Sequence, residues 1–201
     1  MKAVALFSSG IDSPVAAYLM AKKGVEVIAL HMDSRPHTDD AGVEKARGLA
    51  EKVGAKLRVF NNSRFHQEVR DNCNPKLHCI LCKRHMYRVA ERIAEREGAD
   101  FIVTGESIGQ VASQTVENLE VLDNAVKMPV IRPLIGFDKE ETIRIARDIG
   151  TYSISSRKSA GCPFVPKAPA TKSRIEDVLK EESKIDLDAL VEQGASNAEV
   201  T

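Results

Sequence analysis

Small and polar residues that could bind a phosphate group follow an apolar run near the start of the chain. Residues 6–19 read LFSSGIDSPVAAYL, so the small turn 8–10 separates a strand-like segment from a helix-like one. A strand that ends in such a turn and feeds a helix directs backbone N–H groups and the positive end of the helix dipole at one point, which suits an anion. A plainer interpretation stays open, in which Asp12 or Ser13 only caps the helix ahead of Pro14.

The cysteines are the second set of side chains that could do chemistry. They are Cys73, Cys79, Cys82 and Cys162. Cys79 and Cys82 form a CxxC pair at the start of an expected helix, where the helix dipole should lower the pKa of a thiol. Taken alone, the pair fits a redox couple, half of a zinc site or two ligands of an iron–sulfur cluster.

Length and composition restrict the class of protein. A chain of 201 residues that is 43% hydrophobic can bury one sizeable core, and 29 basic residues against 29 acidic ones leave no overall basic field for nucleic acid. No apolar run is long enough to span a membrane, and the start MKAVALFSSG is a poor signal peptide. We therefore expect a cytoplasmic protein without membrane contact, whose cysteines serve metal binding or redox chemistry rather than structural disulfides.

Strands and helices are expected to alternate along the chain. The hydrophobic patterns predict strands at 4–7, 25–32, 56–60, 100–105 and 128–134. They predict helices at 12–23, 40–53, 63–72, 83–97, 109–123 and 138–149, and, after a loop rich in Ser, Pro and Lys, one charged helix at 173–193. This order indicates an α/β fold with a doubly wound, parallel five-stranded sheet and helices on both faces. Ligands in such folds bind at the carboxyl ends of the strands, where the turn 8–10 is expected to lie.

One predicted helix, 83–97, carries an arginine stripe. Its members recur at intervals of four residues and are Arg84, Arg88, Arg92 and Arg96. One interpretation is a solvated face, paired with Glu91 and Glu95. The other is phosphate binding, with Lys83 or Arg84 on a nucleotide and the later arginines on RNA.

Longer segments resemble a known family. The stretch 6–19 is similar to the pyrophosphate loop of the ATP pyrophosphatases, Ser-Gly-Gly-x-Asp-Ser, with Ser9 in place of the first glycine. Together with residues 79–118, 129–155 and 162–172, it resembles the adenylation domain of tRNA 4-thiouridine synthetase, in the thiamine and thiouridine biosynthesis family. The most specific part of the similarity is TGESIGQVASQT, which helix or strand propensity does not explain.

The resemblance implies a fold, a reaction and partners. The fold would be the adenine nucleotide alpha hydrolase type, with the ATP pyrophosphatase domain at 1–172 and a C-terminal helix and tail at 173–201. ATP would adenylate O4 of a tRNA uridine with release of pyrophosphate, and sulfur would then replace the activated oxygen. We expect a stand-alone form without the family's N-terminal RNA-binding and rhodanese domains. Its expected partners are tRNA, a sulfur donor protein or sulfide, a separate RNA-binding subunit and a second copy in a homodimer.

The resemblance also assigns residues. ATP with Mg²⁺ would be bound by Leu6, Phe7, Ser8, Ser9, Gly10, Asp12, Ser13, His31, Met32, Lys83, Arg84, Gly105 and Gln114. The catalytic residues would be Asp12, Cys79, Cys82 and Cys162. The three cysteines are expected to hold an iron–sulfur cluster, with zinc as the alternative, and Cys73 could be a fourth ligand of a closed site. Two other functions stay open: an ATP pyrophosphatase with a different acceptor, and a non-catalytic nucleotide-binding module with structural zinc.

Overall fold

A mixed six-stranded sheet forms the centre of the fold. A computed structural model describes residues 1–200, and its strands are β1 (Lys2–Leu6), β2 (Glu26–Asp33), β3 (Lys56–Asn61), β4 (Phe101–Val103), β5 (Val130–Ile131) and β6 (Glu199–Val200). The order is β5-β4-β1-β2-β3-β6, and all neighbouring strands are parallel except β3 and β6. The predicted α/β fold is confirmed. The sixth strand was missed because a two-residue antiparallel strand has no sequence pattern.

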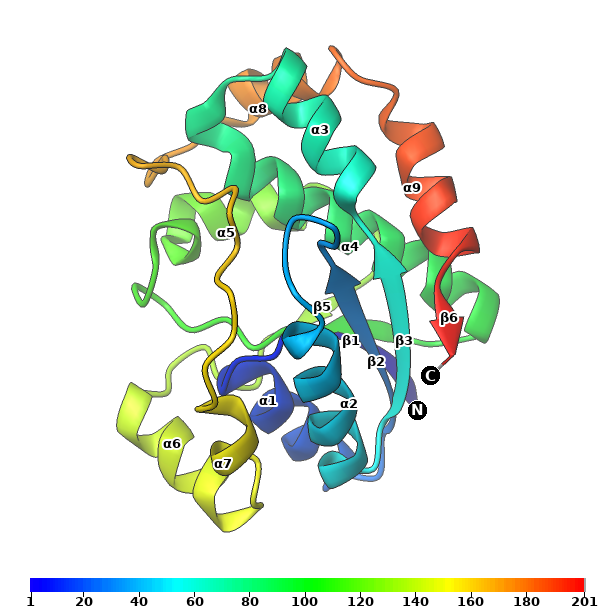
Figure 1. Ribbon diagram of the computed structural model, residues 1–201, viewed down its shortest axis with the longest axis vertical. Coiled ribbons are helices and arrows are strands. Elements are labelled where there is room, and N and C mark those ends of the chain that lie inside the picture. The colour runs from blue at the N-terminus through cyan, green and yellow to red at the C-terminus, as the bar shows by residue number, and fades with distance from the viewer. Residues whose placement is uncertain (201) are drawn as a thin grey trace.

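Helices cover both faces of this sheet (Figure 1). They are α1 (Asp12–Ala21), α2 (Ala41–Val53), α3 (Ser63–Asn72), α4 (His78–Glu97), α5 (Val116–Asp123), α6 (Lys139–Asp148), α7 (Tyr152–Ser155), α8 (Ile175–Glu182) and α9 (Leu187–Ser196). Alternate residues of β1 point to opposite faces. Ala3 and Ala5 pack with α1, α2 and α6, whereas Val4 and Leu6 pack with α4 and α9. No helix of the described residues is long and apolar enough to cross a membrane.

Three predicted helices have different bounds in the structure. Helix α4 begins at His78 rather than at residue 83, after the 3₁₀ turn Pro75–Leu77. The predicted helix 109–123 is α-helical only from Val116, after the 3₁₀ turn Ala112–Gln114, because Thr115 is extended and its side chain caps α5. The predicted helix 173–193 is two helices, since Asp186 caps the start of α9. The short helix α7 was not predicted.

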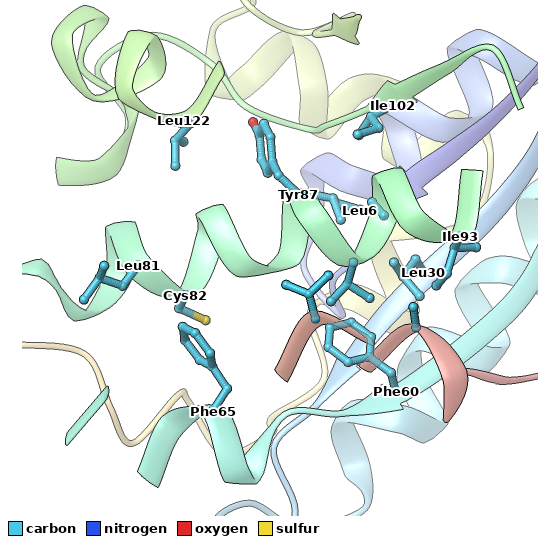
Figure 2. Close-up of a cluster of buried hydrophobic side chains, with 14 of the residues drawn as sticks. Leu6, Leu30, Phe60, Phe65, Leu81, Cys82, Tyr87, Ile93, Ile102 and Leu122 are labelled. Atoms are coloured by element: carbon cyan, nitrogen blue, oxygen red, sulfur yellow. The ribbon is translucent and has the colours of Figure 1, made fainter. Parts of the chain in front are cut away.

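Helix α4 crosses one face of the sheet and places buried side chains on several sides. Its Val89, Ala90 and Ala94 are fully buried in the cluster that Figure 2 shows. Cys82 and Tyr87 leave the helix on different sides, the first toward Phe65 of α3 and the second toward β4 and α5. Helix α4 therefore contacts α3 on one side and β4 and α5 on the other.

The arginine stripe of α4 lies against the C-terminal helices, which neither sequence interpretation included; the pair of half-exposed Arg92 with Glu95 at 2.9 Å is the part that agrees with a solvated face. Arg84 is fully buried, and its guanidinium donates to Glu182 of α8 at 2.8 and 3.0 Å. Arg88 donates to the same carboxylate at 2.7 and 2.9 Å, and Arg92 and Arg96 pair with Glu192 of α9. The predicted contact of Arg84 with ATP is wrong, because this side chain is enclosed by protein.

Candidate active site

Hydrogen bonds within the loop between β1 and α1 fix its shape. The hydroxyl of Ser13 accepts from the backbone N–H of Ser8 at 2.8 Å, and the hydroxyl of Ser8 accepts from the N–H of Gly10 at 3.2 Å. In the described chain, the N–H groups of Ser9 and Ile11 donate to no protein acceptor. The loop thus leaves donors beside the positive end of α1 for an anion.

Two sequence questions about this loop are answered by its backbone. Residue 11 precedes the helix, and no side chain caps the first turn, so neither Asp12 nor Ser13 acts as the N-cap. No residue other than glycine has a positive φ angle within residues 1–200, so serine at position 9 is accommodated without backbone strain.

A lysine that the sequence did not single out lies against Asp12. The carboxylate of Asp12 accepts from Nζ of Lys139 at 2.6 Å, which brings the first turn of α6 next to the loop. Asp12 and Lys139 keep 28% and 45% of their side-chain surface exposed, so both can reach a bound ligand. The site therefore pairs a carboxylate with a partly exposed cation beside the loop's N–H groups.

The loop faces the end of β4 at the point where the strand order reverses between β1 and β4. A pocket there is lined by several predicted ATP-binding residues, namely Leu6, Ser8, Asp12, Ser13, Lys83, Gly105 and Gln114. The side-chain oxygen of Gln114 is buried and has no hydrogen-bond partner. An orphaned polar atom at a topological switch point indicates a place for a polar ligand.

Gly105 allows the loop itself to approach β4. A Cβ atom at this position would lie 2.6 Å from the backbone nitrogen of Ser13 and 2.8 Å from the carbonyl carbon of Asp12. Gly105 was predicted to bind ATP, but the nearest atoms to a Cβ at this position belong to the first turn of α1. The TGES segment, residues 104–107, therefore packs directly against the backbone of the loop at Gly105.

Replacing Gly105 with alanine should therefore displace the loop. We expect the free energy of unfolding to fall by about 1–3 kcal/mol, because backbone atoms must move to admit the methyl group. Urea denaturation measures this loss. Gly136→Ala is the matched control, since a Cβ there would have no neighbour within 4 Å. Equal stability of the two variants would show that the loop yields without cost.

Glu106 is the centre of a buried network that the sequence did not reveal. Its carboxylate accepts from Lys83 at 2.9 Å, from the hydroxyl of Tyr87 at 2.6 Å and from Arg132 at 2.9 Å. Burial would raise the pKa of Glu106, but the charge of Lys83 and these hydrogen bonds outweigh it and lower the pKa to about 2. The ionised carboxylate holds Lys83 at the edge of the pocket.

A second pocket lies on the other side of the loop. Its lining includes Phe7, Ser8, Ser9, His31, Met32 and Cys162. Nδ1 of His31 is 2.8 Å from the carbonyl oxygen of Phe7, and burial lowers the pKa of the imidazole. The histidine therefore ties the ends of β1 and β2 together, while both strand ends remain on the pocket wall.

Three of the four cysteines, Cys79, Cys82 and Cys162, lie in one region, and Cys162 lines this second pocket. Cys82 is buried, and its thiol donates to the sulfur of Met32 at 3.7 Å. Burial, and then the nearby Cys162, raise the pKa of the Cys79 and Cys82 thiols. The expected lowering by the helix dipole is therefore wrong, because loss of hydration outweighs it. No three metal-binding side chains among residues 1–200 are arranged around one point.

Cys73 lies apart from the other cysteines. It is buried in the core, and its thiol donates to the carbonyl oxygen of Glu181 at 3.4 Å. Burial raises the pKa of this thiol too, and the charge of Glu181 adds to the effect. The contact joins the end of α3 to α8, which gives Cys73 a packing role.

The comparison with known proteins identifies the family. The sequence model of a family described as thiamine biosynthesis protein (ThiI) matches residues 1–187. The chain belongs to the ThiI family. This confirms the resemblance found from the pyrophosphate loop and the TGESIGQVASQT segment.

The relatives that match this chain are longer proteins. A probable tRNA sulfurtransferase of Finegoldia magna is 45% identical over 202 residues, which are 97% of this chain and 52% of that protein. One from Methanobrevibacter smithii is 46% identical, over 88% of this chain and 48% of its own. A crystal structure of a 4-thiouridine synthetase with RNA and bound ATP superimposes with a TM-score of 0.94 at 41% identity, covering all of this chain and 54% of that one. The chain thus spans about half the length of these relatives.

Proposed function

We propose that this chain is the catalytic domain of an ATP-dependent tRNA sulfurtransferase. It adenylates O4 of a uridine, releases pyrophosphate and lets sulfur replace the activated oxygen to give 4-thiouridine. The observation that carries the proposal is the pocket between the loop and Gly105, where Asp12, Lys83 and the unpartnered oxygen of Gln114 converge. The similarity to a 4-thiouridine synthetase that binds ATP and RNA supports the same assignment.

The phosphates of ATP would be bound by the loop. The N–H groups of Ser9 and Ile11 and the start of α1 supply donors and positive potential without a rearrangement of the backbone. The adenosine would occupy the neighbouring pocket between Phe7 and Met32, next to His31. The carboxylate of Asp12 is an oxygen donor that suits Mg²⁺ arriving with the nucleotide.

The same groups would stabilise the leaving pyrophosphate. Negative charge grows on the bridging oxygen when the α-phosphorus is attacked by the uridine oxygen, and fixed N–H donors and lysine cations offset that charge. Lys139 is held by Asp12 at 2.6 Å and Lys83 by Glu106 at 2.9 Å, so both cations are oriented before the substrate binds. The orientation of these two lysines is what the chain would contribute to the release of pyrophosphate.

Cys79, Cys82 and Cys162 are the residues that would hold an iron–sulfur cluster. Three soft thiol donors fit this group chemically, and Cys162 is close enough to raise the pKa of the other two, although among the described residues the three thiols are not gathered around one point. A cluster bound by these three cysteines would leave one iron without a protein ligand, where sulfide for the transfer could bind. Because ligation requires thiolates, loading should release protons from these thiols.

Cysteine variants test this assignment. We expect Cys79→Ala, Cys82→Ala and Cys162→Ala each to lose most of the iron and sulfide bound after anaerobic reconstitution. Cys73→Ala is the control and should load normally, since its thiol contacts Glu181 instead. Iron and sulfide analysis with absorption spectra gives the result. Full loading of Cys162→Ala would contradict the three-cysteine site, and zinc bound in place of iron would support the structural alternative.

The acceptor is tested by pyrophosphate release. Purified chain with ATP should release pyrophosphate when bulk tRNA is added, and nuclease digestion of that tRNA should yield 4-thiouridine when a sulfide source is present. Release with small metabolites but not with tRNA would favour an ATP pyrophosphatase with another acceptor. No release under any condition would favour a non-catalytic nucleotide-binding module.

RNA binding by the domain alone should be weak. The chain has equal numbers of basic and acidic residues, and α4 uses Arg84 and Arg88 for contacts inside the protein. We propose that tight binding of tRNA needs either a separate subunit that carries an RNA-binding region or a homodimer, which doubles the basic surface of one chain. We also propose that the enzyme works in the cytoplasm with a sulfur donor protein or sulfide.

A further inference from the structure

The segment that carries Cys162 crosses the molecule as an extended strap, defined here as residues 156–172 between α7 and α8 (Figure 1). Its start is fixed by Lys45, whose Nζ donates to the carbonyl oxygen of Arg157 at 2.9 Å. Its end is fixed by Asn118, which donates to the carbonyl oxygen of Ala170 at 3.0 Å. Both attachments lie several residues away from Cys162.

The middle of the strap has a different attachment. Between residues 160 and 169, no hydrogen bond joins the strap to the rest of the described chain. Phe164 is partly buried, whereas Cys162, Pro163 and Val165 are exposed. Pro166 and Pro169, farther along the strap, are also partly buried, but among residues 160–165 only Phe164 is, so its ring is the side chain next to Cys162 that can fix this part of the strap.

Phe164 is stacked on a pair of histidines. Its ring centroid lies 4.1 Å from that of His66 with an interplanar angle of 9°, and 5.4 Å from that of His78 with an angle of 2°. The edge of His37 approaches from another direction, with centroids 4.9 Å apart at 83°. Three rings from three segments thus define the position of this one side chain.

The histidine pair is a rigid support. His66 is fully buried, and its Nδ1 lies 2.9 Å from Nε2 of His78, so the two rings are joined by a hydrogen bond. His78 is the first residue of α4 and directly precedes Cys79. The stack therefore joins the strap, two residues after Cys162, to the helical turn that carries the other two thiols.

We infer that Phe164 is a positioning residue that holds Cys162 over the Cys79 and Cys82 turn. The inference rests on the proposed function for its purpose, since it explains how the exposed Cys162 on an extended strap stays near partly buried Cys79 and buried Cys82. Without the stack, residues 160–169 would be tied to the rest of the described chain only through the two ends of the strap, and Cys162 would sample a larger volume. This larger volume would lower the effective concentration of the Cys162 thiol near Cys79 and Cys82.

Thiol–disulfide equilibrium measures that concentration directly. The full chain is equilibrated anaerobically with reduced and oxidised glutathione, so that two protein thiols and one glutathione disulfide give one protein disulfide and two glutathiones. Peptide mapping by mass spectrometry quantifies bonds from Cys162 to Cys79 or Cys82. We expect Phe164→Ala to lower the effective concentration about tenfold, as expected when aromatic contacts of this kind are lost.

Matched variants separate positioning from folding. Val165→Ala changes the next, exposed residue and should leave the equilibrium unchanged, and Phe164→Tyr should restore most of the wild-type value. All variants should show the same far-UV spectrum. An unchanged equilibrium in Phe164→Ala, or no measurable disulfide from Cys162 in the wild type, would overturn the inference. Because this measurement needs neither ATP nor RNA, it stands or falls separately from the sulfurtransferase assignment.

Discussion

Changing Asp12 to alanine should lower ATP-dependent pyrophosphate release by about 10²–10³-fold while the fold stays intact. The carboxylate lies at the loop where the phosphates would bind and holds Lys139 at 2.6 Å. Removing one such interaction with developing charge typically raises the activation barrier by about 3–4 kcal/mol. The loss in stability should be small, because the pair with Lys139 is partly exposed and screened by water.

Steady-state rates and thermal unfolding together test this prediction. The control is Asp71→Ala, which removes an exposed carboxylate that pairs with Arg70 of α3, away from the loop. It should leave both the rate and the unfolding temperature unchanged. If Asp12→Ala retained activity within a few-fold of wild type, Asp12 would have no part in the chemistry, and its role would be limited to the contact with α6.

The loop and the sheet could be predicted from the sequence because their signals are local. The apolar run 4–7, the turn 8–10 and the helix after it lie within a few turns of chain, and the observed β1, loop and α1 follow them. Gln114 was assigned to the site through the family resemblance, and its orphaned oxygen gives that assignment a physical reason. The predicted elements agree best with the observed ones where a strand and the helix after it are adjacent in the chain.

Long-range partners explain what the sequence could not show. The carboxylate of Glu106 is surrounded by Lys83, Tyr87 and Arg132, which come from α4 and from the segment after β5. Lys139 reaches Asp12 across 127 positions of sequence. Helical spacing put the arginines of α4 in one stripe but contained no information about what covers that stripe. Only the folded chain places α8 and α9 there.

Changing Glu182 to alanine should lower the free energy of unfolding by about 3–5 kcal/mol, because it leaves buried Arg84 without its carboxylate. Arg84 has no exposed side-chain surface and Glu182 keeps 7%, so water cannot replace the lost partner. Glu192→Ala is the matched control on the same stripe. Its carboxylate is 55% exposed and pairs with Arg92 and Arg96, so the loss should stay below about 1 kcal/mol.

Glu182→Gln then separates charge from shape. Burial would raise the pKa of Glu182, but the hydrogen bonds from Arg84 and Arg88 outweigh it, so the folded-state pKa lies below the unfolded one. The ionised carboxylate therefore stabilises the fold above the unfolded-state pKa of about 4.3, and this contribution is lost as the pH falls through the folded-state pKa. Urea denaturation at several pH values should show the wild type losing its advantage over Glu182→Gln in acid. A difference that does not change with pH would mean that Glu182 acts through packing, and that α8 is held on α4 without its charge.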